Sequence, residues 1–150
     1  MENAGRHAQD LSLNSSIVSK LLVDFVRDET RNAGFQRGVI GLSGGVDSAV
    51  SAFIAAEALG PDNLLGVMMP YRTSNPRSLR DAELVAATLG LKTETVDITP
   101  MVDAFLLQSN GGDKLRAGNV MARQRMIVLY DRSSRDKALV IGTSNKTETF

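Results

Sequence analysis

The sequence contains no cysteine, no tryptophan and a single histidine, His7. Without cysteine there is no disulfide framework, no thiolate metal site and no cysteine nucleophile, which excludes a cysteine-based glutaminase within this chain. No apolar run reaches membrane-spanning length, and the polar N-terminus lacks the apolar core of a signal peptide. We therefore expect a cytoplasmic protein without a membrane partner.

An excess of charge of either sign is also missing. Seventeen Lys and Arg residues balance seventeen Asp and Glu residues, so the composition predicts no basic surface for nucleic acid. The chain has 150 residues, of which 43% are hydrophobic and 23% charged, as is typical of one globular domain with a real core. We expect a polar N-terminal segment, residues 1–13, followed by a single domain, residues 14–150.

Apolar patterning predicts that strands and helices alternate along this domain. Helices are expected from Asn14 to Gly34, Ala49 to Gly60, Asn75 to Gly90, Thr99 to Leu107 and Ala117 to Tyr130, the last burying Val120, Met121, Ile127 and Val128. Strands are expected over Gly38–Ser43, Leu64–Met69, Lys92–Ile98 and Lys137–Gly142, the third with charges typical of an edge. The alternation predicts an α/β fold with a doubly wound parallel sheet in the order 3-2-1-4.

The loop between the first strand and the next helix has the features of a phosphate-binding site. It reads Gly41-Leu42-Ser43-Gly44-Gly45-Val46-Asp47-Ser48. Its glycines let backbone amides approach an anion, the helix N-terminus favours negative charge, and two serines add hydroxyl donors. Asp47 would repel a phosphate unless a divalent cation lay between them, so we predict that it is a magnesium ligand.

Other known motifs fit this loop less well. It lacks the Gly-Lys-Ser/Thr of a Walker A loop and does not fit the Gly-x-Gly-x-x-Gly of a dinucleotide site. Gly41, Ser43 and Gly45 match a nucleophile elbow, but that fold needs a histidine after the serine, and His7 precedes it. A glycine turn in which Asp47 only complements the helix dipole is the non-functional alternative.

A second polar cluster, Gly142 to Glu148, follows the fourth strand. In the order 3-2-1-4, the first and fourth strands flank the point where strand order reverses, and ligands bind there in doubly wound sheets. Asp47 and Glu148 could then share one magnesium ion. Asn145 and Glu148 also have capping-box spacing and could simply start a helix, so the residues alone leave both interpretations open.

Several segments resemble known families. Ser43–Ser48 resembles the pyrophosphate loop of N-type ATP pyrophosphatases, and Gly142–Glu148, Gly118–Met126 and Met69–Arg72 are similar to segments of ammonia-dependent NAD synthetases. The similarity covers nearly all of residues 14–150. It implies an adenine nucleotide alpha hydrolase-like fold, magnesium bound by Asp47 and Glu148, and deamido-NAD bound by Arg123. It also implies ATP bound by Gly41, Leu42, Ser43, Gly44, Gly45, Val46, Asp47, Ser48, Arg72 and Thr143.

Helix geometry separates Arg123 from Arg125. Two residues on a helix point about 200° apart, so both cannot readily address one ligand. We expect Arg125 to lie on a solvated helix face.

The resemblance implies a ligase that joins ammonia to deamido-NAD. ATP would adenylate the nicotinate carboxylate, and ammonia would then displace AMP, giving NAD, AMP and pyrophosphate. The family also implies a homodimer. GMP synthetase, a tRNA-thiolating enzyme and a non-catalytic nucleotide-binding fragment are the alternatives. Because NAD synthetases continue past the second polar cluster, we expect a domain incomplete after Phe150, and we expect residues 1–150 alone to synthesise NAD more slowly than a full-length relative.

Overall fold

The computed structural model describes residues 14–108 and 113–143. The predicted N-terminal segment 1–13, His7 and Glu148 lie outside these ranges. In chain order the elements are α1 (Ser15–Asn32), β1 (Arg37–Gly41), α2 (Val46–Leu59), a 3-10 turn (Pro61–Asn63), β2 (Leu64–Met68), α3 (Pro76–Leu89), β3 (Lys92–Thr95), α4 (Thr99–Gln108), α5 (Lys114–Asp136) and β4 (Ala138–Ile141).

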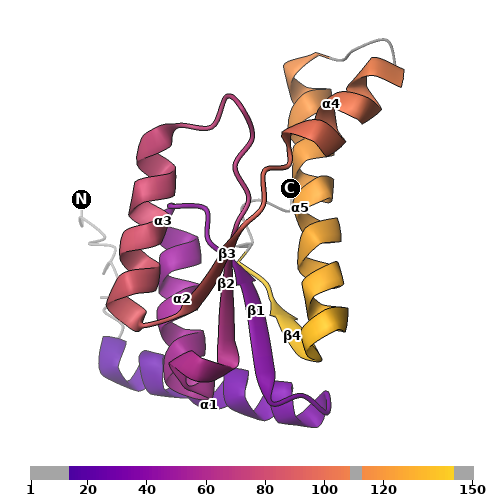
Figure 1. The fold of residues 1–150 in the computed structure, drawn as a ribbon. Helices are drawn as coiled ribbons and strands as arrows, with labels where there is room; N and C mark the ends of the chain where they lie inside the picture. The colour runs from indigo at the N-terminus through magenta and orange to yellow at the C-terminus, as the bar shows by residue number, and fades with distance from the viewer. Residues whose placement is uncertain (1–13, 109–112, 144–150) are drawn as a thin grey trace, which may run out of the picture.

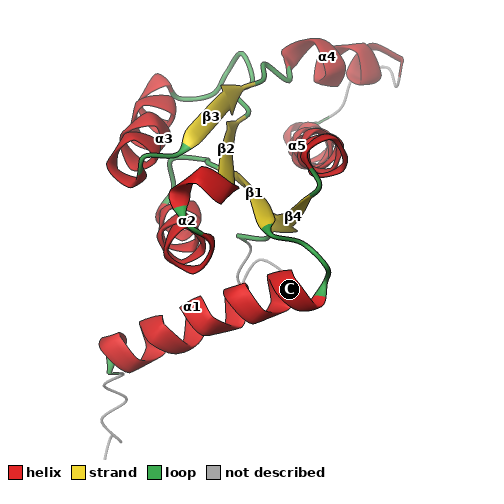
Figure 2. Cartoon of the chain, turned by 60° about the horizontal axis from the view of Figure 1, so that its bottom comes forward, coloured by secondary structure: helices red, strands yellow, loops and turns green. Residues whose placement is uncertain are grey.

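The four strands form one parallel sheet in the order β3-β2-β1-β4, which confirms the predicted topology. β1 lies inside the sheet, where Val39 pairs with Leu65 of β2 and with Val140 of β4. Helices α1, α2 and α3 lie on one side of the sheet, and α4 and α5 lie on the other (Figures 1 and 2). The fold is therefore the predicted doubly wound α/β arrangement.

The predicted starts of α1 and α3 coincide with capped N-termini, whereas α2 begins at Val46, three residues before the predicted Ala49. Asn14 accepts a hydrogen bond from the amide of Ile17, and Asn75 accepts one from the amide of Arg77, with a proline in the first turn of α3. Asp113 caps α5 in the same way, through the amide of Arg116. The cap at Asp113 explains why α5 begins three residues earlier than the predicted start at Ala117.

Two apolar layers hold the helices to the sheet. One layer joins α2 and α3 to the sheet and includes Ile40, Ala52, Ala55, Leu64, Ala82 and Ala86. The other lies under α4 and α5 and includes Val39, Val67, Ile98, Val102 and Val128. The buried side of α2 is built mainly from alanines, which allow close approach to the sheet, whereas its larger residues Val50 and Phe53 are exposed.

Two predicted details of the second layer are wrong. Ile127 is 57% exposed, whereas Val128, predicted to be buried with it, faces the sheet at 5% exposure. Helix α5 also runs to Asp136, six residues past the predicted end at Tyr130. Its polar last turns gave no apolar signal, and ion pairs hold them to the sheet.

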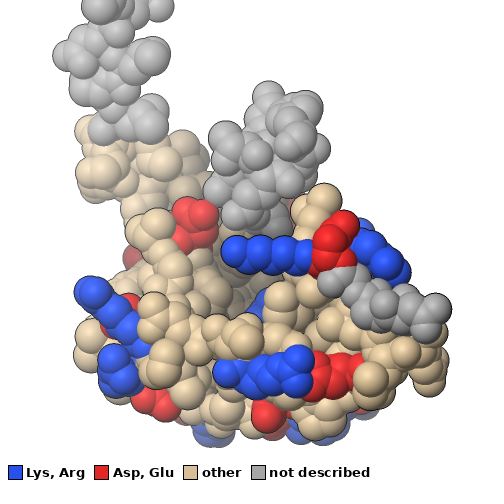
Figure 3. Space-filling model, turned by 90° about the horizontal axis from the view of Figure 1, so that it is seen from above, with Lys and Arg blue, Asp and Glu red and all other residues tan. Residues whose placement is uncertain are grey.

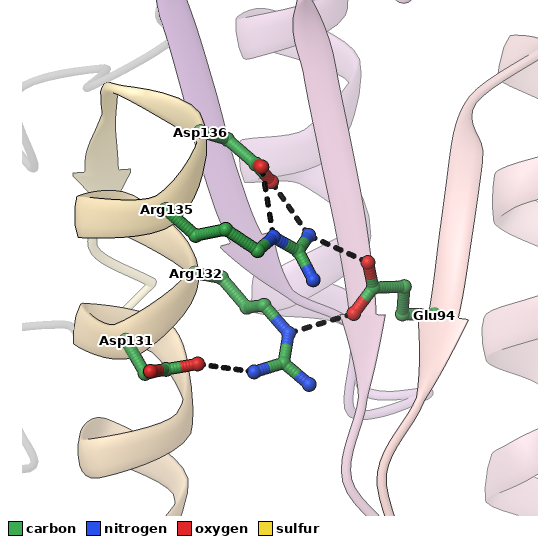
Figure 4. Close-up of polar contacts among 5 residues, drawn as sticks. All are labelled: Glu94, Asp131, Arg132, Arg135 and Asp136. Atoms are coloured by element: carbon green, nitrogen blue, oxygen red, sulfur yellow. Dashed lines mark hydrogen bonds and ion pairs between the residues drawn. The ribbon is translucent and has the colours of Figure 1, made fainter.

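These ion pairs connect the end of α5 to the edge strand β3 (Figure 4). Glu94 of β3 accepts from Arg132 at 2.7 Å and from Arg135 at 2.6 Å, and Arg135 also pairs with Asp136. Arg132 pairs with Asp131 as well. The guanidinium of Arg135, and then that of Arg132, lowers the pKa of Glu94. The network fixes α5 across the face of the sheet.

No helix within residues 14–108 and 113–143 combines the length and the apolar character needed to cross a membrane.

Candidate nucleotide-binding site

A crevice of about 500 Å³ opens at the carboxyl ends of β1, β2 and β4. Its walls come from the end of β1, the start of α3 and the middle of α5: Gly41, Leu42, Ser43, Met68, Met69, Pro70, Ser74, Asn75, Ser78, Leu79, Ala122, Arg125, Met126, Leu129 and Thr143. Seen from above, this end of the molecule is hollowed, with both basic and acidic side chains around the hollow (Figure 3). The crevice lies where strand order reverses, as predicted for a doubly wound sheet.

Two serine hydroxyls hold the loop after β1 in shape. The Ser48 hydroxyl donates to the carbonyl of Gly45 at 2.9 Å and accepts from the amide of Ser43 at 3.2 Å. The Ser43 hydroxyl accepts from the amide of Gly45 at 3.2 Å and lies 3.0 Å from the Ser48 hydroxyl. Ser48 is almost fully buried, at 4% exposure. The loop is therefore pre-organised by its own side chains.

Gly44 brings this loop against the start of α3. Its φ of +79° is in the left-handed region, and a Cβ atom placed on it would lie 2.1 Å from the carbonyl oxygen of Ser78. No side chain fits in that space. Glycine at this position therefore satisfies both the backbone conformation and the close packing of the loop.

The N-terminus of α3 lines the crevice, and that of α2 follows the loop that packs beside it. Gly45 caps α2 without a side-chain hydrogen bond, so no side chain of the cap covers this end of the helix. Asn75, Ser78 and Leu79, from the N-terminal end of α3, line the opposite side. Because helix N-termini carry partial positive charge, the crevice favours an anion such as a phosphate.

Asp47 stands in the first turn of α2 and is exposed. A magnesium ion commonly takes one or two carboxylates and completes its shell with substrate phosphates and water. The carboxylate of Asp47, beside amides that suit phosphates, fits this donor set. Within residues 14–108 and 113–143, no group of three His, Cys, Asp or Glu side chains could hold a metal without such a ligand. The second predicted carboxylate, Glu148, lies outside the described residues.

The two remaining residues predicted to contact ATP differ in position. Thr143 lines the crevice beside the loop. Arg72 is instead paired with Asp103 of α4 at 2.7 Å and lies over the ring of Tyr71, and it does not line the crevice. The hydroxyl of Tyr71 donates to the same carboxylate, and this hydrogen bond raises the pKa of Tyr71. The structure thus brings Thr143, but not Arg72, to the candidate site.

Arg123 and Arg125 diverge on α5, as helix geometry predicts. Arg123 is exposed and donates to the carbonyl and the side chain of Asn119 on its own helix. The prediction that Arg125 lies on a solvated face is wrong. Arg125 is partly buried, lines the crevice, and donates through Nε to the carbonyl of Met69 at 3.1 Å. Burial lowers the pKa of its guanidinium.

The position of Arg125 had a signal in the sequence. Met121, Arg125, Val128 and Arg132 are spaced by four, three and four residues, so they share one side of a helix. Val128 is the buried member of this row. Arg125 therefore faces the sheet with Val128, whereas Arg123 does not.

The parallel order 3-2-1-4 and the pyrophosphate-type loop at its switch point define a nucleotide-binding α/β protein of the adenine nucleotide alpha hydrolase-like class. Within this class, the NAD synthase family model matches residues 18–150. The chain belongs to the NAD synthase family.

Curated relatives have the same assignment. The chain is 54% identical over 142 residues to the NH(3)-dependent NAD(+) synthetase of Chlorobium phaeobacteroides (strain BS1), covering 95% of this chain and 51% of the relative. It is 49% identical over 140 residues to that of Fusobacterium nucleatum, covering 93% of this chain and 54% of the relative. The chain thus spans about half the length of the curated relatives it matches.

Solved structures agree with the fold. The NH3-dependent NAD synthetase from Campylobacter jejuni matches with a TM-score of 0.87 and 38% identity, over 92% of this chain and 60% of that chain. The NMN synthetase from Francisella tularensis matches with a TM-score of 0.85 and 31% identity, over 91% of this chain and 57% of that chain.

Proposed function

We propose that the protein carrying this chain amidates deamido-NAD with ammonia at the expense of ATP, giving NAD, AMP and pyrophosphate. One observation carries the proposal. A loop rich in glycine and serine borders a crevice at the switch point of the sheet, in a chain of the NAD synthase family. Curated relatives 49% and 54% identical to this chain are named NH(3)-dependent NAD(+) synthetases, which supports the choice of substrates over those of GMP synthetase or a tRNA-thiolating enzyme.

In the proposed reaction, all bonds that form and break belong to the substrates. An oxygen of the nicotinate carboxylate attacks the α-phosphorus of ATP, and the bond to the β-phosphate oxygen breaks. Pyrophosphate leaves with the electron pair and is held by the loop from Ser43 to Ser48. Ammonia then attacks the acyl carbon, and AMP leaves with the carboxylate oxygen that made the attack.

The protein's part in this scheme is positioning and charge stabilisation rather than covalent catalysis. In this scheme the amides at the start of α2 and the exposed hydroxyl of Ser43 contact the phosphates, while the buried hydroxyl of Ser48 holds the loop in shape. We propose Asp47 and Glu148 as magnesium ligands, and the metal would neutralise part of the phosphate charge. Thr143 contacts ATP, and Arg123 binds deamido-NAD, as the family resemblance implies.

Isotope transfer tests the proposed function. Deamido-NAD labelled with ¹⁸O in its carboxylate is incubated with the protein, ATP, magnesium and ammonia, and the products are examined by mass spectrometry. One labelled oxygen is expected in AMP and none in pyrophosphate. A label found in inorganic phosphate, together with ADP, would show transfer of the γ-phosphoryl group and refute adenylation.

The same assay with the mononucleotide acceptor tests the acceptor assignment. A structural neighbour is an NMN synthetase, so nicotinate mononucleotide is the relevant competitor. We propose the dinucleotide as the better substrate, because the curated relatives are named for the synthesis of a dinucleotide, NAD(+). A higher kcat/KM for the mononucleotide would reverse the assignment and leave adenylation intact.

We also propose a homodimer located in the cytoplasm, as the family resemblance implies. An apolar row on α1 supports a protein interface: Ile17, Leu21 and Phe25 are spaced by four residues and are 58%, 63% and 62% exposed. Analytical ultracentrifugation of the protein and of its Leu21→Glu variant tests this. A wild-type monomer at micromolar concentration would contradict the dimer.

A further inference from the structure

Arg125 has a buried charge that the described part of the chain does not neutralise. Its guanidinium is partly buried, and within residues 14–108 and 113–143 no carboxylate lies within ion-pair distance. The arginines nearer the end of the same helix, Arg132 and Arg135, are both paired with Glu94. Burying a cation without an anion is costly, so Arg125 has a different role from its neighbours.

The hydrogen bond to Met69 explains how Arg125 is held. Alternate residues of β2 face alternate neighbouring strands: the carbonyl of Val67 accepts from Leu42 beside β1, whereas those of Met68 and Pro70 accept from Val96 and Ile98 after β3. The carbonyl of Met69 therefore points toward β1, where the chain has already turned away into the loop. Arg125 takes this position with Nε. Its position is set by the same switch point that forms the crevice.

Only one of the five N–H groups of the guanidinium is used in this bond. The other four belong to the two terminal nitrogens, and the side chain that carries them lines the crevice together with Ser43 and Thr143. The N-termini of α2 and α3 add positive potential to the same space. An anion bound beside Arg125 would therefore be stabilised, and would in turn stabilise the cation.

We propose that Arg125 binds the α-phosphate of ATP during adenylation. This inference rests on the proposed function. The loop from Ser43 to Ser48 holds the two phosphates that leave, so the α-phosphate lies next to the loop and between it and α5. The terminal nitrogens of Arg125 donate to the non-bridging oxygens of the α-phosphate, where charge increases as the carboxylate attacks. Arg125 would remain in contact with AMP after pyrophosphate has left.

The two ligand fragments make this proposal testable. AMP carries the α-phosphate alone, and inorganic pyrophosphate represents the phosphates held by the loop. Binding of each is measured by calorimetry with the wild type, Arg125→Met, Arg125→Lys and, as the control, Arg116→Met. Arg116 is an exposed arginine near the start of the same helix and does not line the crevice.

Arg125→Met is expected to lower the affinity for AMP by about tenfold or more, the loss typical of a charge-assisted contact. Its affinity for pyrophosphate should change by about twofold or less, because the loop makes those contacts separately. Arg125→Lys should fall between wild type and Arg125→Met for AMP, since a lysine keeps the charge but cannot donate as a fork. Arg116→Met should match the wild type for both ligands.

Equal losses of AMP and pyrophosphate affinity in Arg125→Met would mean that the side chain only supports the fold, and unchanged AMP affinity would also overturn the proposal. If the wild type binds neither fragment nor ATP, the proposed function itself fails. A measurement on the wild type covers the case in which Arg125→Met does not fold: the guanidinium ¹⁵N signals of Arg125 should shift on adding AMP and much less on adding pyrophosphate. Signals that respond only to pyrophosphate would refute the assignment.

Discussion

Gly44 has a left-handed backbone conformation and packs closely against Ser78, and replacing it with alanine tests both properties. The added methyl group would have to be carried at a φ of +79°, and it would lie 2.1 Å from the carbonyl oxygen of Ser78 and 2.8 Å from the two carbons beside it. Side-chain Cβ atoms essentially never come within 3.0 Å of another atom. The loop and the start of α3 must therefore separate by about 1 Å.

Gly34 provides the matched control. Its φ is +82°, nearly that of Gly44, but a Cβ placed on it meets nothing within 4 Å. Gly34→Ala should therefore lower the free energy of unfolding only through the left-handed backbone, by about 1–2 kcal/mol. Gly44→Ala carries the same cost and an overpacking cost of about 1–3 kcal/mol.

Urea unfolding measures the difference. The free energy of unfolding falls by about 2 kcal/mol for each M of urea. The additional loss of stability in Gly44→Ala should therefore lower its unfolding midpoint by about 0.5–1.5 M of urea relative to Gly34→Ala. Binding of pyrophosphate should weaken in Gly44→Ala only, because only there does the loop move. Equal midpoints for the two variants, with equal pyrophosphate affinity, would refute the close packing of Gly44 against α3.

Three further changes have defined outcomes. Asp47→Asn should keep the fold but weaken ATP binding measured calorimetrically with magnesium, since an amide is a poorer ligand for a hard cation; the same affinity in variant and wild type would leave Asp47 only a helix-dipole role. Ser48→Ala should lower the free energy of unfolding by about 1–2 kcal/mol in urea, because the amide of Ser43 loses its acceptor; an unchanged midpoint would contradict this. Glu94→Gln should lower it by about 1 kcal/mol at pH 7, since both arginines lose their shared anion. Because the pKa of Glu94 is lowered in the folded state, this difference should disappear as the pH falls below about 4.5, and a difference independent of pH would refute the network.

The elements and their ends were largely predictable because their signals are local. Asn14 and the pair Asn75-Pro76 mark the starts of α1 and α3, and the observed caps confirm both. The tail of α5 was missed because Arg132 and Arg135 are held by Glu94, which lies about forty residues earlier in the sequence. Helix propensity contains no information about such a distant partner.

The candidate site was predictable where its chemistry is contained in one segment. The loop from Gly41 to Ser48 has its glycines, hydroxyls and helix start together, and the structure builds it from those parts. The helical row that Arg125 shares with Val128 indicates its inward direction, but not its partner, because the carbonyl of Met69 is left open by strand register. Arg72 was placed with ATP by resemblance, whereas its side chain pairs with Asp103 on α4.

The central claim is that the loop and crevice at the carboxyl ends of the strands bind the phosphates of a nucleotide. Backbone ¹⁵N–¹H spectra recorded while magnesium pyrophosphate is added to the labelled protein test it directly. We expect the amide signals of Gly44, Gly45 and Val46 to shift in a saturable way, while that of Lys92, beside a second hollow at the opposite ends of the strands, stays constant. Saturable shifts at Lys92 with an unchanged loop would contradict the account.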